Sequence, residues 1–350
     1  MSMENNFNQK LEFLNFDRSV TFSKDILILD GISGTGKTMF TPILSSFDRV
    51  QNARFEYMLE YLSIAYNHKK MSSDAAKTLL TLLTDVKCYD GMISREVNFR
   101  PKDLSSVFKS TKILQYIRQL TMQDGKFVES RLTNEDPIVF FVTHQLLNCF
   151  DIIFQTFHSR LKLVETVRHP IYLIDHWLSY IKMFGNNSRD FTVWLKYKEK
   201  SIPWFAKNWA EKYIAVSDYD KVVYSIDYFY QKIFRLIHSD KPKDNVLFVP
   251  FEQFVLKPKK FINKLEFLLG TNSSKSTSKT LKNQHVPRRH INQGPKKSIY
   301  ERYGAQKIRN VFTPEEDLEK RLSHSKEKCS KEAFQKLEKL QENLGNKEPR

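Results

Sequence analysis

Four short, mostly apolar segments recur along the chain, at residues 26–29, 137–142, 161–167 and 245–251. A strand covered on both faces has this pattern, because its side chains are buried whichever way they point. The segments between them carry apolar residues at spacings of three and four, which is typical of amphipathic helices. Strands that alternate with helices predict an α/β fold of three layers with a mainly parallel central sheet.

Helical patterns extend over residues 37–46, most of 54–125, 170–184, 191–216, 219–238 and 257–270. Residues 271–283 are rich in Ser and Lys and predict a loop or a mobile linker. From Pro314 onwards the pattern predicts a charged helix or helix pair. We therefore expect one domain over residues 1–310, with helical insertions at about 54–125 and 185–240, and a charged helical segment at 311–350.

The chain is basic, with 56 Lys and Arg residues against 40 Asp and Glu residues among 350. This excess is typical either of a solvated Lys-rich surface or of a protein that binds an anionic partner. The sequence contains no basic-aromatic repeat and no zinc signature, so nucleic acid is not the expected partner.

Three widely spaced cysteines, Cys88, Cys149 and Cys329, argue against a disulfide framework and favour a reducing compartment. No secretory signal pattern and no apolar stretch of about 18 residues is found. We therefore expect a cytoplasmic protein without a membrane span.

The strongest motif follows the first apolar segment, where Gly31 and the run Gly36-Lys37-Thr38 have the spacing of a phosphate-binding loop (P-loop). Backbone N–H groups in such a loop, together with the start of the next helix, surround an anion. The fold class expected is therefore a P-loop-type three-layer α/β fold. The motif predicts phosphate binding but does not identify the reaction.

The ends of the other apolar segments differ from those of an ATPase. A P-loop ATPase holds Mg²⁺ partly through an Asp at the end of a neighbouring strand. Here the second segment ends in Thr143-His144, the third in Arg168, and the fourth runs into Glu252. Basic groups thus occupy positions where a metal site needs carboxylates, and this favours a metal-free reaction of a highly anionic cofactor.

In order and spacing these motifs resemble those of the sulfotransferase family that uses 3′-phosphoadenosine-5′-phosphosulfate (PAPS). The P-loop matches the family's 5′-phosphosulfate loop, and "VFFVTHQLL" matches a strand that ends in a Thr-His pair. The segment "LVETVRHPIYLIDHWLSY" matches a strand that runs into Arg-x-Pro and a helix. The match extends from about residue 25 to residue 300.

The resemblance implies transfer of a sulfuryl group from PAPS to a hydroxyl or amine of a glycan or small molecule, without a metal. It implies a general base at His144, for which imidazole is suited because its unperturbed pKa is about 6.5. Lys37 would stabilise charge on the leaving group, and Arg168 would bind the 3′-phosphate, aided by His176 and Arg288. The cofactor-binding loop residues are Gly31, Ser33, Gly34, Thr35, Gly36, Lys37 and Thr38.

The sequence departs from the family pattern at three positions. The loop cation stands at Lys37, whereas the family has it at the position of Gly34. A Ser of the 3′-phosphate motif is replaced by His176, with Ser179 one turn later. The family's late Arg-Lys-Gly signature is matched only loosely, by Arg288, Arg289 and Gly294.

Other interpretations stay open at this point. The intact Gly-Lys-Thr also fits a P-loop kinase or ATP-binding protein that uses Mg-ATP, and a nucleotide-binding scaffold without catalysis fits as well. Arg168 can instead pair with an acid such as Asp175. Three tryptophans of the aromatic segment can line an acceptor pocket or belong to the core; they are Trp194, Trp204 and Trp209. The acceptor itself cannot be inferred from this sequence.

Overall fold

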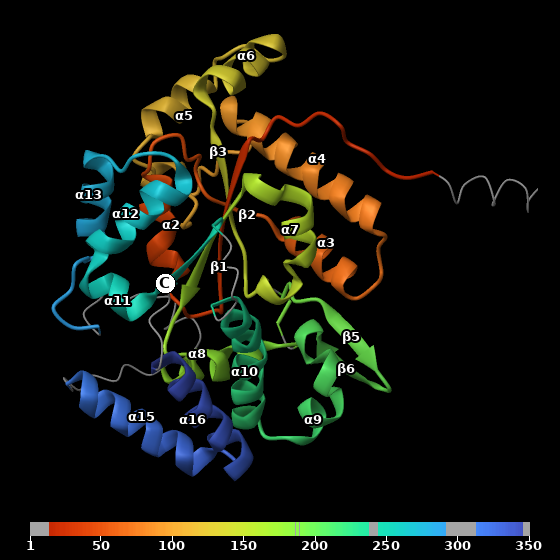
Figure 1. Cartoon of the computed structure of the whole chain (residues 1–350), viewed down its shortest axis with the longest axis vertical. Helices are drawn as coiled ribbons and strands as arrows, with labels where there is room; N and C mark the ends of the chain where they lie inside the picture. The colour runs from red at the N-terminus through yellow and green to blue at the C-terminus, as the bar shows by residue number, and fades with distance from the viewer. Residues whose placement is uncertain (1–13, 186, 189, 238–243, 292–312, 346–350) are drawn as a thin grey trace, which may run out of the picture.

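The computed structural model describes residues 14–185, 187–188, 190–237, 244–291 and 313–345. Five parallel strands form its central sheet in the order β2-β3-β1-β4-β7 (Figure 1). The strands are β1 (Asp25–Gly31), β2 (Arg54–Phe55), β3 (Ile138–Val142), β4 (Leu161–Val167) and β7 (Val246–Pro250). The four apolar segments thus became β1, β3, β4 and β7, as predicted.

The two faces of the sheet belong to two separate cores, which explains the apolar runs. On β1, Ile26 and Ile28 point into one core, whereas Leu27 and Leu29 point into the other. All four side chains are fully buried. Since neither face of the sheet meets water, the strand needs no polar position, and the parallel α/β class is confirmed.

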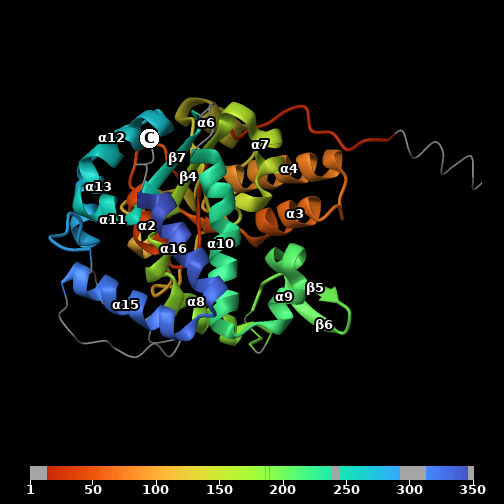
Figure 2. The same cartoon turned by 60° about the horizontal axis from the view of Figure 1, so that its bottom comes forward.

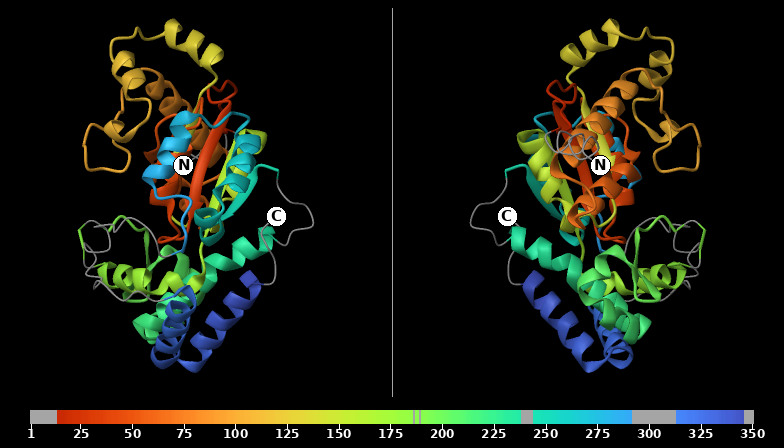
Figure 3. Two further views of the ribbon diagram at one scale, coloured as in Figure 1. Left: turned by 90° about the vertical axis from the view of Figure 1, so that its left-hand side faces the viewer. Right: turned by 90° about the vertical axis from the view of Figure 1, so that its right-hand side faces the viewer.

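Helices cover both faces and complete the three layers (Figures 1 and 3). One layer contains α2 (Lys37–Ser45), α11 (Phe251–Leu256), α12 (Pro258–Leu269) and α13 (Lys275–Asn283). The opposite layer contains α3 (Tyr57–Asn67), α4 (Ser73–Met92) and α7 (Asp151–Phe157). Beyond the carboxyl ends of the strands lie α8 (Ile174–Met183) and α10 (Asp218–Ile237). At the other end of the sheet lie α5 (Ile113–Gln119) and α6 (Lys126–Glu135).

The predicted C-terminal helix pair is present as α15 (Pro314–Lys328) and α16 (Lys331–Gly345). The second of these packs along α10 (Figure 2). Its apolar face, made by Ala333, Leu337 and Leu340, is buried in the core that also contains residues of α10. Arg321 of α15 binds Asp175 of α8, with 2.6 Å between Nη1 and Oδ2. The pair therefore packs against the elements that lie at the carboxyl edge of the sheet.

The prediction of helix over residues 191–216 was wrong in its first half. This segment forms a hairpin of β5 (Trp194–Tyr197) and β6 (Lys200–Pro203), followed by a 3₁₀ turn, η5 (Trp204–Trp209), and by α9 (Ala210–Ala215). Lys198 makes the turn with a φ of 54°. The aromatic spacing fits a short strand as well as a helix, and Pro203 cannot continue a helix because it lacks an N–H.

The prediction of a loop or linker over residues 271–283 was also wrong, because α13 occupies most of it. Ser274 caps this helix and forms a capping box with Thr277. The Thr277 hydroxyl also donates to the carbonyl oxygen of Ser46 at 3.2 Å. A local cap together with this contact to α2 fixes a segment whose composition is typical of a loop. Among the described helices, none combines the length and hydrophobicity that crossing a membrane requires.

Candidate functional site

The P-loop connects β1 to α2 at the carboxyl edge of the sheet. Gly31, Gly34 and Gly36 have φ values of 143°, 99° and 99°, which side chains rarely allow. Two of these glycines also have no room for a Cβ atom. A Cβ atom on Gly31 would overlap the Thr166 side chain and lie 2.6 Å from its carbonyl oxygen. A Cβ on Gly36 would lie 2.5 Å from Phe251. The glycines thus let the backbone form a tight loop before the start of α2.

Side chains from three other segments, namely the loop after β3, the strand β4 and the helix α8, hold the middle of the loop in place. The N–H of Ser33 donates to Oε1 of Gln145 at 3.2 Å, and its carbonyl oxygen accepts from Trp177 Nε1 at 3.0 Å. The Ser33 hydroxyl lies 2.8 Å from Nε2 of His176. The Thr35 hydroxyl lies 2.7 Å from that of Thr166 on β4. The loop is therefore preorganised by β3, β4 and α8, whose positions in the sequence are far from it.

Lys37 and Thr38 form the first turn of α2. The ammonium group of Lys37 is buried and donates to the carbonyl oxygens of Gly31 and Ile32. Burial lowers the pKa of Lys37, while the nearby charge of Asp30 opposes this shift. Burial, together with the charge of Asp30, raises the pKa of Glu165 well above its usual value, so this carboxyl favours its neutral form. Thr38 is half-buried.

Asp30 organises the neighbouring loop that follows β3. Its Oδ1 accepts from the Thr143 hydroxyl at 2.9 Å. Its Oδ2 accepts from the N–H groups of Leu146 and Leu147, both at 2.8 Å. His144 lies between these attachment points, so a carboxylate at the end of β1 sets where the imidazole stands.

His144 is held by a carboxylate that the sequence analysis did not identify. Glu60 of α3 lies with Oε1 2.9 Å from Nδ1 of His144 and 3.2 Å from its backbone nitrogen. A carboxylate only accepts hydrogen bonds, so Nδ1 carries the proton and Nε2 keeps a lone pair. The side chain of His144 is 31% exposed, whereas that of Glu60 is 10% exposed. The imidazole thus combines a buried orienting partner with an accessible basic nitrogen.

Arg168 reaches from the end of β4 to the P-loop. One of its terminal nitrogens donates to the carbonyl oxygen of Gly34 at 2.8 Å. Its guanidinium lies over the ring of Phe251, at 4.7 Å from the centroid. Its Nε is buried without a hydrogen bond among the described residues. The alternative partner Asp175 binds Arg321 instead, and the acid beside Arg168 is Glu252, at 3.9 Å.

Arg288 approaches the same ring, with its guanidinium carbon 5.4 Å from the centroid of Phe251. Burial and the charge of Arg168 lower the pKa of Arg288. Two guanidinium groups that share one ring and repel each other are stabilised when an anion binds between or beside them. Of the other residues in the late signature, Arg289 is exposed and Gly294 lies outside the described residues.

His176 lies against the loop through Ser33, where the sequence placed a candidate phosphate ligand. Burial and the positive charges of Lys37 and Arg168 lower the pKa of His176 to about 4. It is therefore neutral near pH 7 and contributes a hydrogen bond rather than a charge. Ser179, the other candidate, donates to the carbonyl oxygen of Asp175 at 3.2 Å.

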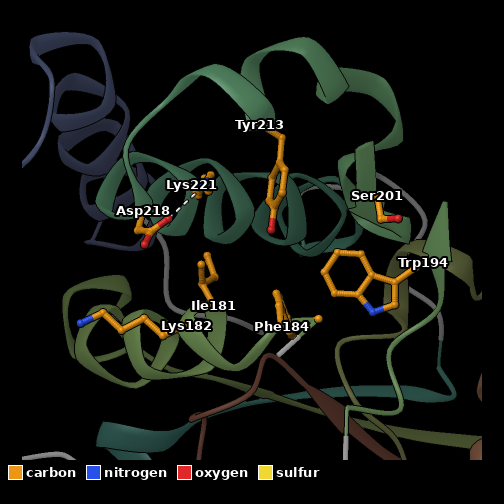
Figure 4. A pocket seen from close by; sticks show the side chains of 9 residues that line it. Ile181, Lys182, Phe184, Trp194, Ser201, Tyr213, Asp218 and Lys221 are labelled. Atoms are coloured by element: carbon orange, nitrogen blue, oxygen red, sulfur yellow. Dashed lines mark hydrogen bonds and ion pairs between the residues drawn. The ribbon is translucent and has the colours of Figure 1, made fainter. Parts of the chain in front are cut away.

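A cavity of about 670 Å³ opens between α8, the β5–β6 hairpin and helices α9 and α10 (Figure 4). Phe184, Trp194 and Tyr213 face it, and Lys221 pairs with Asp218 at its edge, at 2.8 Å. Of the three tryptophans proposed to line an acceptor pocket, only Trp194 is among its lining residues. Trp204 is buried in the core. The lining includes none of the predicted site residues.

The structure thus brings Lys37, Arg168, His176 and Arg288 to the P-loop and places His144 on the adjacent strand end. Glu60, Thr166 and Phe251 complete the site and were not predicted. Each of them meets a partner that is distant in the sequence: Glu60 is 84 positions from His144, and Thr166 is 131 positions from Thr35. No local motif marks these residues, because the chain must fold before the contacts exist. Among the described residues no group of His, Cys, Asp and Glu side chains has a metal-binding arrangement.

No family model matches the chain, and no curated protein matches it. The solved structures that are similar to it include two sulfotransferase domains. One is the sulfotransferase domain from the Synechococcus PCC 7002 olefin synthase, at 11% identity and a TM-score of 0.45, covering 96% of this chain and 100% of that one. The other is the sulfotransferase domain from the curacin biosynthetic pathway, at 10% identity and a TM-score of 0.42, covering 86% of this chain and 96% of that one.

Proposed function

We propose that the protein is a sulfotransferase that uses PAPS as its sulfuryl donor. The observation that carries this proposal is the convergence of cationic groups on the P-loop from separate strand ends. Lys37 follows β1, while Arg168 follows β4 and hydrogen-bonds Gly34. Arg288 lies over the same phenyl ring as Arg168. A nucleotide with anionic groups at both its 5′ and 3′ positions matches this distribution of charge.

The residues present fit such a nucleotide. The glycines from Gly31 to Gly36 allow a tight turn before α2, because a Cβ atom at Gly31 or Gly36 would overlap Thr166 or Phe251. A glycine-rich turn at the start of a helix is suited to bind an anion through its backbone N–H groups. The guanidinium of Arg168 has a buried Nε that lacks a hydrogen bond among the described residues, and its planar shape suits two phosphate oxygens. We assign the 5′ phosphosulfate to the P-loop and the 3′-phosphate to Arg168 and Arg288, with His176 as a neutral hydrogen-bonding group.

When bound, PAPS would supply the sulfuryl group that the acceptor oxygen or nitrogen receives. His144 would take the proton of the acceptor on Nε2, because Nδ1 is already bound to Glu60. The carboxylate of Glu60 would stabilise the imidazolium that results. Lys37 would leave its carbonyl partners and place its charge beside the leaving group, which is an electrostatic contribution.

The intact Gly36-Lys37-Thr38 run favours a second candidate function, a kinase or ATP-binding protein that needs Mg²⁺. The carboxylates nearest to Lys37 are poorly suited to that role. Asp30 already accepts three hydrogen bonds, from Thr143, Leu146 and Leu147. Glu165 is buried and favours its neutral form. We therefore rank sulfuryl transfer above phosphoryl transfer.

Titration calorimetry with adenosine 3′,5′-bisphosphate and with ADP tests the donor. We expect the bisphosphate to bind at least tenfold more tightly than ADP, in buffer that contains EDTA. His144→Ala should keep this affinity within threefold and abolish sulfuryl transfer. Tight binding of ADP that requires Mg²⁺, together with no preference for the bisphosphate, would refute the proposal and support the kinase alternative.

A further inference from the structure

Aromatic rings gather beside His144, and two of them are exposed to water. The centroid of the imidazole lies 6.0 Å from that of Phe55, at an interplanar angle of 27°, and 5.9 Å from that of Tyr57, at 9°. The ring of Phe191 lies 5.6 Å from that of Tyr57. Phe191 is 57% exposed and Tyr57 38% exposed. We call Phe55, Tyr57 and Phe191 the aromatic surface.

The chain holds this surface in place by hydrogen bonds. The Tyr61 hydroxyl donates to the carbonyl oxygen of Phe191 at 2.9 Å, and so ties the segment before β5 to α3. Asp190 accepts from the N–H groups of Gly185 and Thr192 and from Trp194 Nε1, each at 3.0 Å. Rings in fixed positions bind a ligand at a lower entropic cost than rings on a free loop.

Among the described residues, two carboxylates lie near the aromatic surface, although the protein as a whole is basic. Glu60 lies behind His144, and Asp190 lies next to Phe191. Burial, followed by the charges of Glu60 and Asp190, raises the pKa of the Tyr61 phenol on this side of α3. An acceptor with a carboxylate or sulfate group would be repelled here, whereas a neutral one would not.

The 670 Å³ cavity is a poorer candidate for the acceptor. Its lining includes Lys182, Asp218 and Lys221, and neither His144 nor any residue of the aromatic surface. The acceptor hydroxyl must come within hydrogen-bond distance of the base that takes its proton. The aromatic surface lies beside this base, because the ring centroids of Phe55 and Tyr57 are 6.0 Å and 5.9 Å from that of the imidazole.

We propose that the acceptor is a neutral hydroxyl compound with an aromatic body, and that Tyr57 and Phe191 bind this body beside His144. Exposed apolar side chains gathered at one place often mark a binding site, and aromatic ligands stack on aromatic rings. This inference rests on the proposed sulfotransferase function for its chemical meaning. The binding itself is independent of the donor and can be measured without it.

The test uses three probes that differ in charge and in aromatic area. These are 2-naphthol, 6-hydroxy-2-naphthoate, which adds one carboxylate, and methyl glucoside, which has hydroxyls but no aromatic ring. Binding to the full chain is measured by saturation-transfer NMR and by calorimetry, with and without adenosine 3′,5′-bisphosphate. We expect 2-naphthol to bind at least tenfold more tightly than either comparison compound. Phe191→Ala should weaken its binding about tenfold.

Phe267→Ala is the matched control, because Phe267 is 86% exposed on α12, and it should leave binding unchanged. Phe191→Leu, which keeps an apolar side chain, replaces Phe191→Ala should the latter fail to fold. Equal binding of 6-hydroxy-2-naphthoate or methyl glucoside would overturn the inference, as would unchanged binding in the Phe191 variants. If 2-naphthol binds and the bisphosphate does not, the donor assignment is refuted, whereas the proposed aromatic site is supported.

Discussion

Glu60 and His144 are 84 positions apart in the sequence, yet Oε1 of one lies 2.9 Å from Nδ1 of the other. The carboxylate comes from α3, and the imidazole comes from the loop after β3. This pair fixes which nitrogen of the imidazole is available to an acceptor, because the other nitrogen donates to the carboxylate. Several expected results depend on this pair and on the P-loop beside it.

Glu60→Gln should lower kcat for sulfuryl transfer about 10- to 100-fold, with the affinity for adenosine 3′,5′-bisphosphate within twofold. The amide oxygen can still accept from Nδ1, but it no longer carries the charge that stabilises an imidazolium. Steady-state kinetics and calorimetry measure the two quantities. Glu56→Gln is the control, since Glu56 pairs with Lys87 at 3.0 Å and not with His144. An equal loss in both variants would contradict the role given to Glu60.

Arg168→Lys should weaken binding of adenosine 3′,5′-bisphosphate about tenfold or more, although the charge is kept. A lysine ammonium cannot make two parallel hydrogen bonds to phosphate, nor replace the bond from the guanidinium to Gly34. Calorimetry on the purified variant measures the change. The same substitution at Arg100, whose side chain is 83% exposed, should have no effect. Unchanged affinity in the Arg168 variant would place the 3′-phosphate elsewhere.

Gly31→Ala should lower the free energy of unfolding by about 2–5 kcal/mol, as the sum of overpacking and backbone strain. The new methyl group would meet Thr166 in a backbone conformation with a φ of 143°. Gly270→Ala isolates the backbone contribution, because φ is 57° there and no atom lies within 4 Å of the added Cβ. It should cost about 1–2 kcal/mol. Urea unfolding measures both variants, and a smaller loss at Gly31 than at Gly270 would refute the packing argument.

Burial lowers the pKa of His169 to about 4. This residue should therefore contribute to a decrease in the free energy of unfolding as the pH falls from 6.5 to 4. The unfolded imidazole binds a proton below about pH 6.5, whereas the folded one does not until about pH 4. The unfolded state therefore binds more protons in this window, and the stability decreases as the pH decreases. Among the described residues Nδ1 of His169 has no hydrogen-bond partner. A proton on this nitrogen would therefore be buried without an acceptor.

The variant His169→Gln should accordingly lose about 1–2 kcal/mol less stability than the wild type between pH 7 and pH 5. Urea unfolding at the two pH values gives this difference. The control is His285→Gln, because His285 is exposed, and it should follow the wild type. A pH dependence of His169→Gln that matches the wild type would show that this imidazole does not contribute.

The sequence by itself determined the features that depend on nearest neighbours in the chain. Strands buried on both faces need continuous apolar residues, so β1, β3, β4 and β7 were predictable from the residues that form them. The P-loop was predictable because glycine is required wherever the backbone takes a positive φ close to other atoms. Since parallel strands carry their functional residues at one edge, the sequence also indicated which side chains follow those strands.

The tertiary structure decided whatever depends on segments that meet only after folding. Glu60 orients His144, Arg168 and Arg288 both lie over the ring of Phe251, and Thr166 supports the P-loop. No local spacing encodes these contacts. The hairpin at 194–203 and the helix α13 were mispredicted because their local patterns were ambiguous. For α13, the contact of Thr277 with Ser46 adds what composition does not reveal. The chemistry of a side chain depends on the charges near it and on how deeply it is buried, and both are properties of the folded chain.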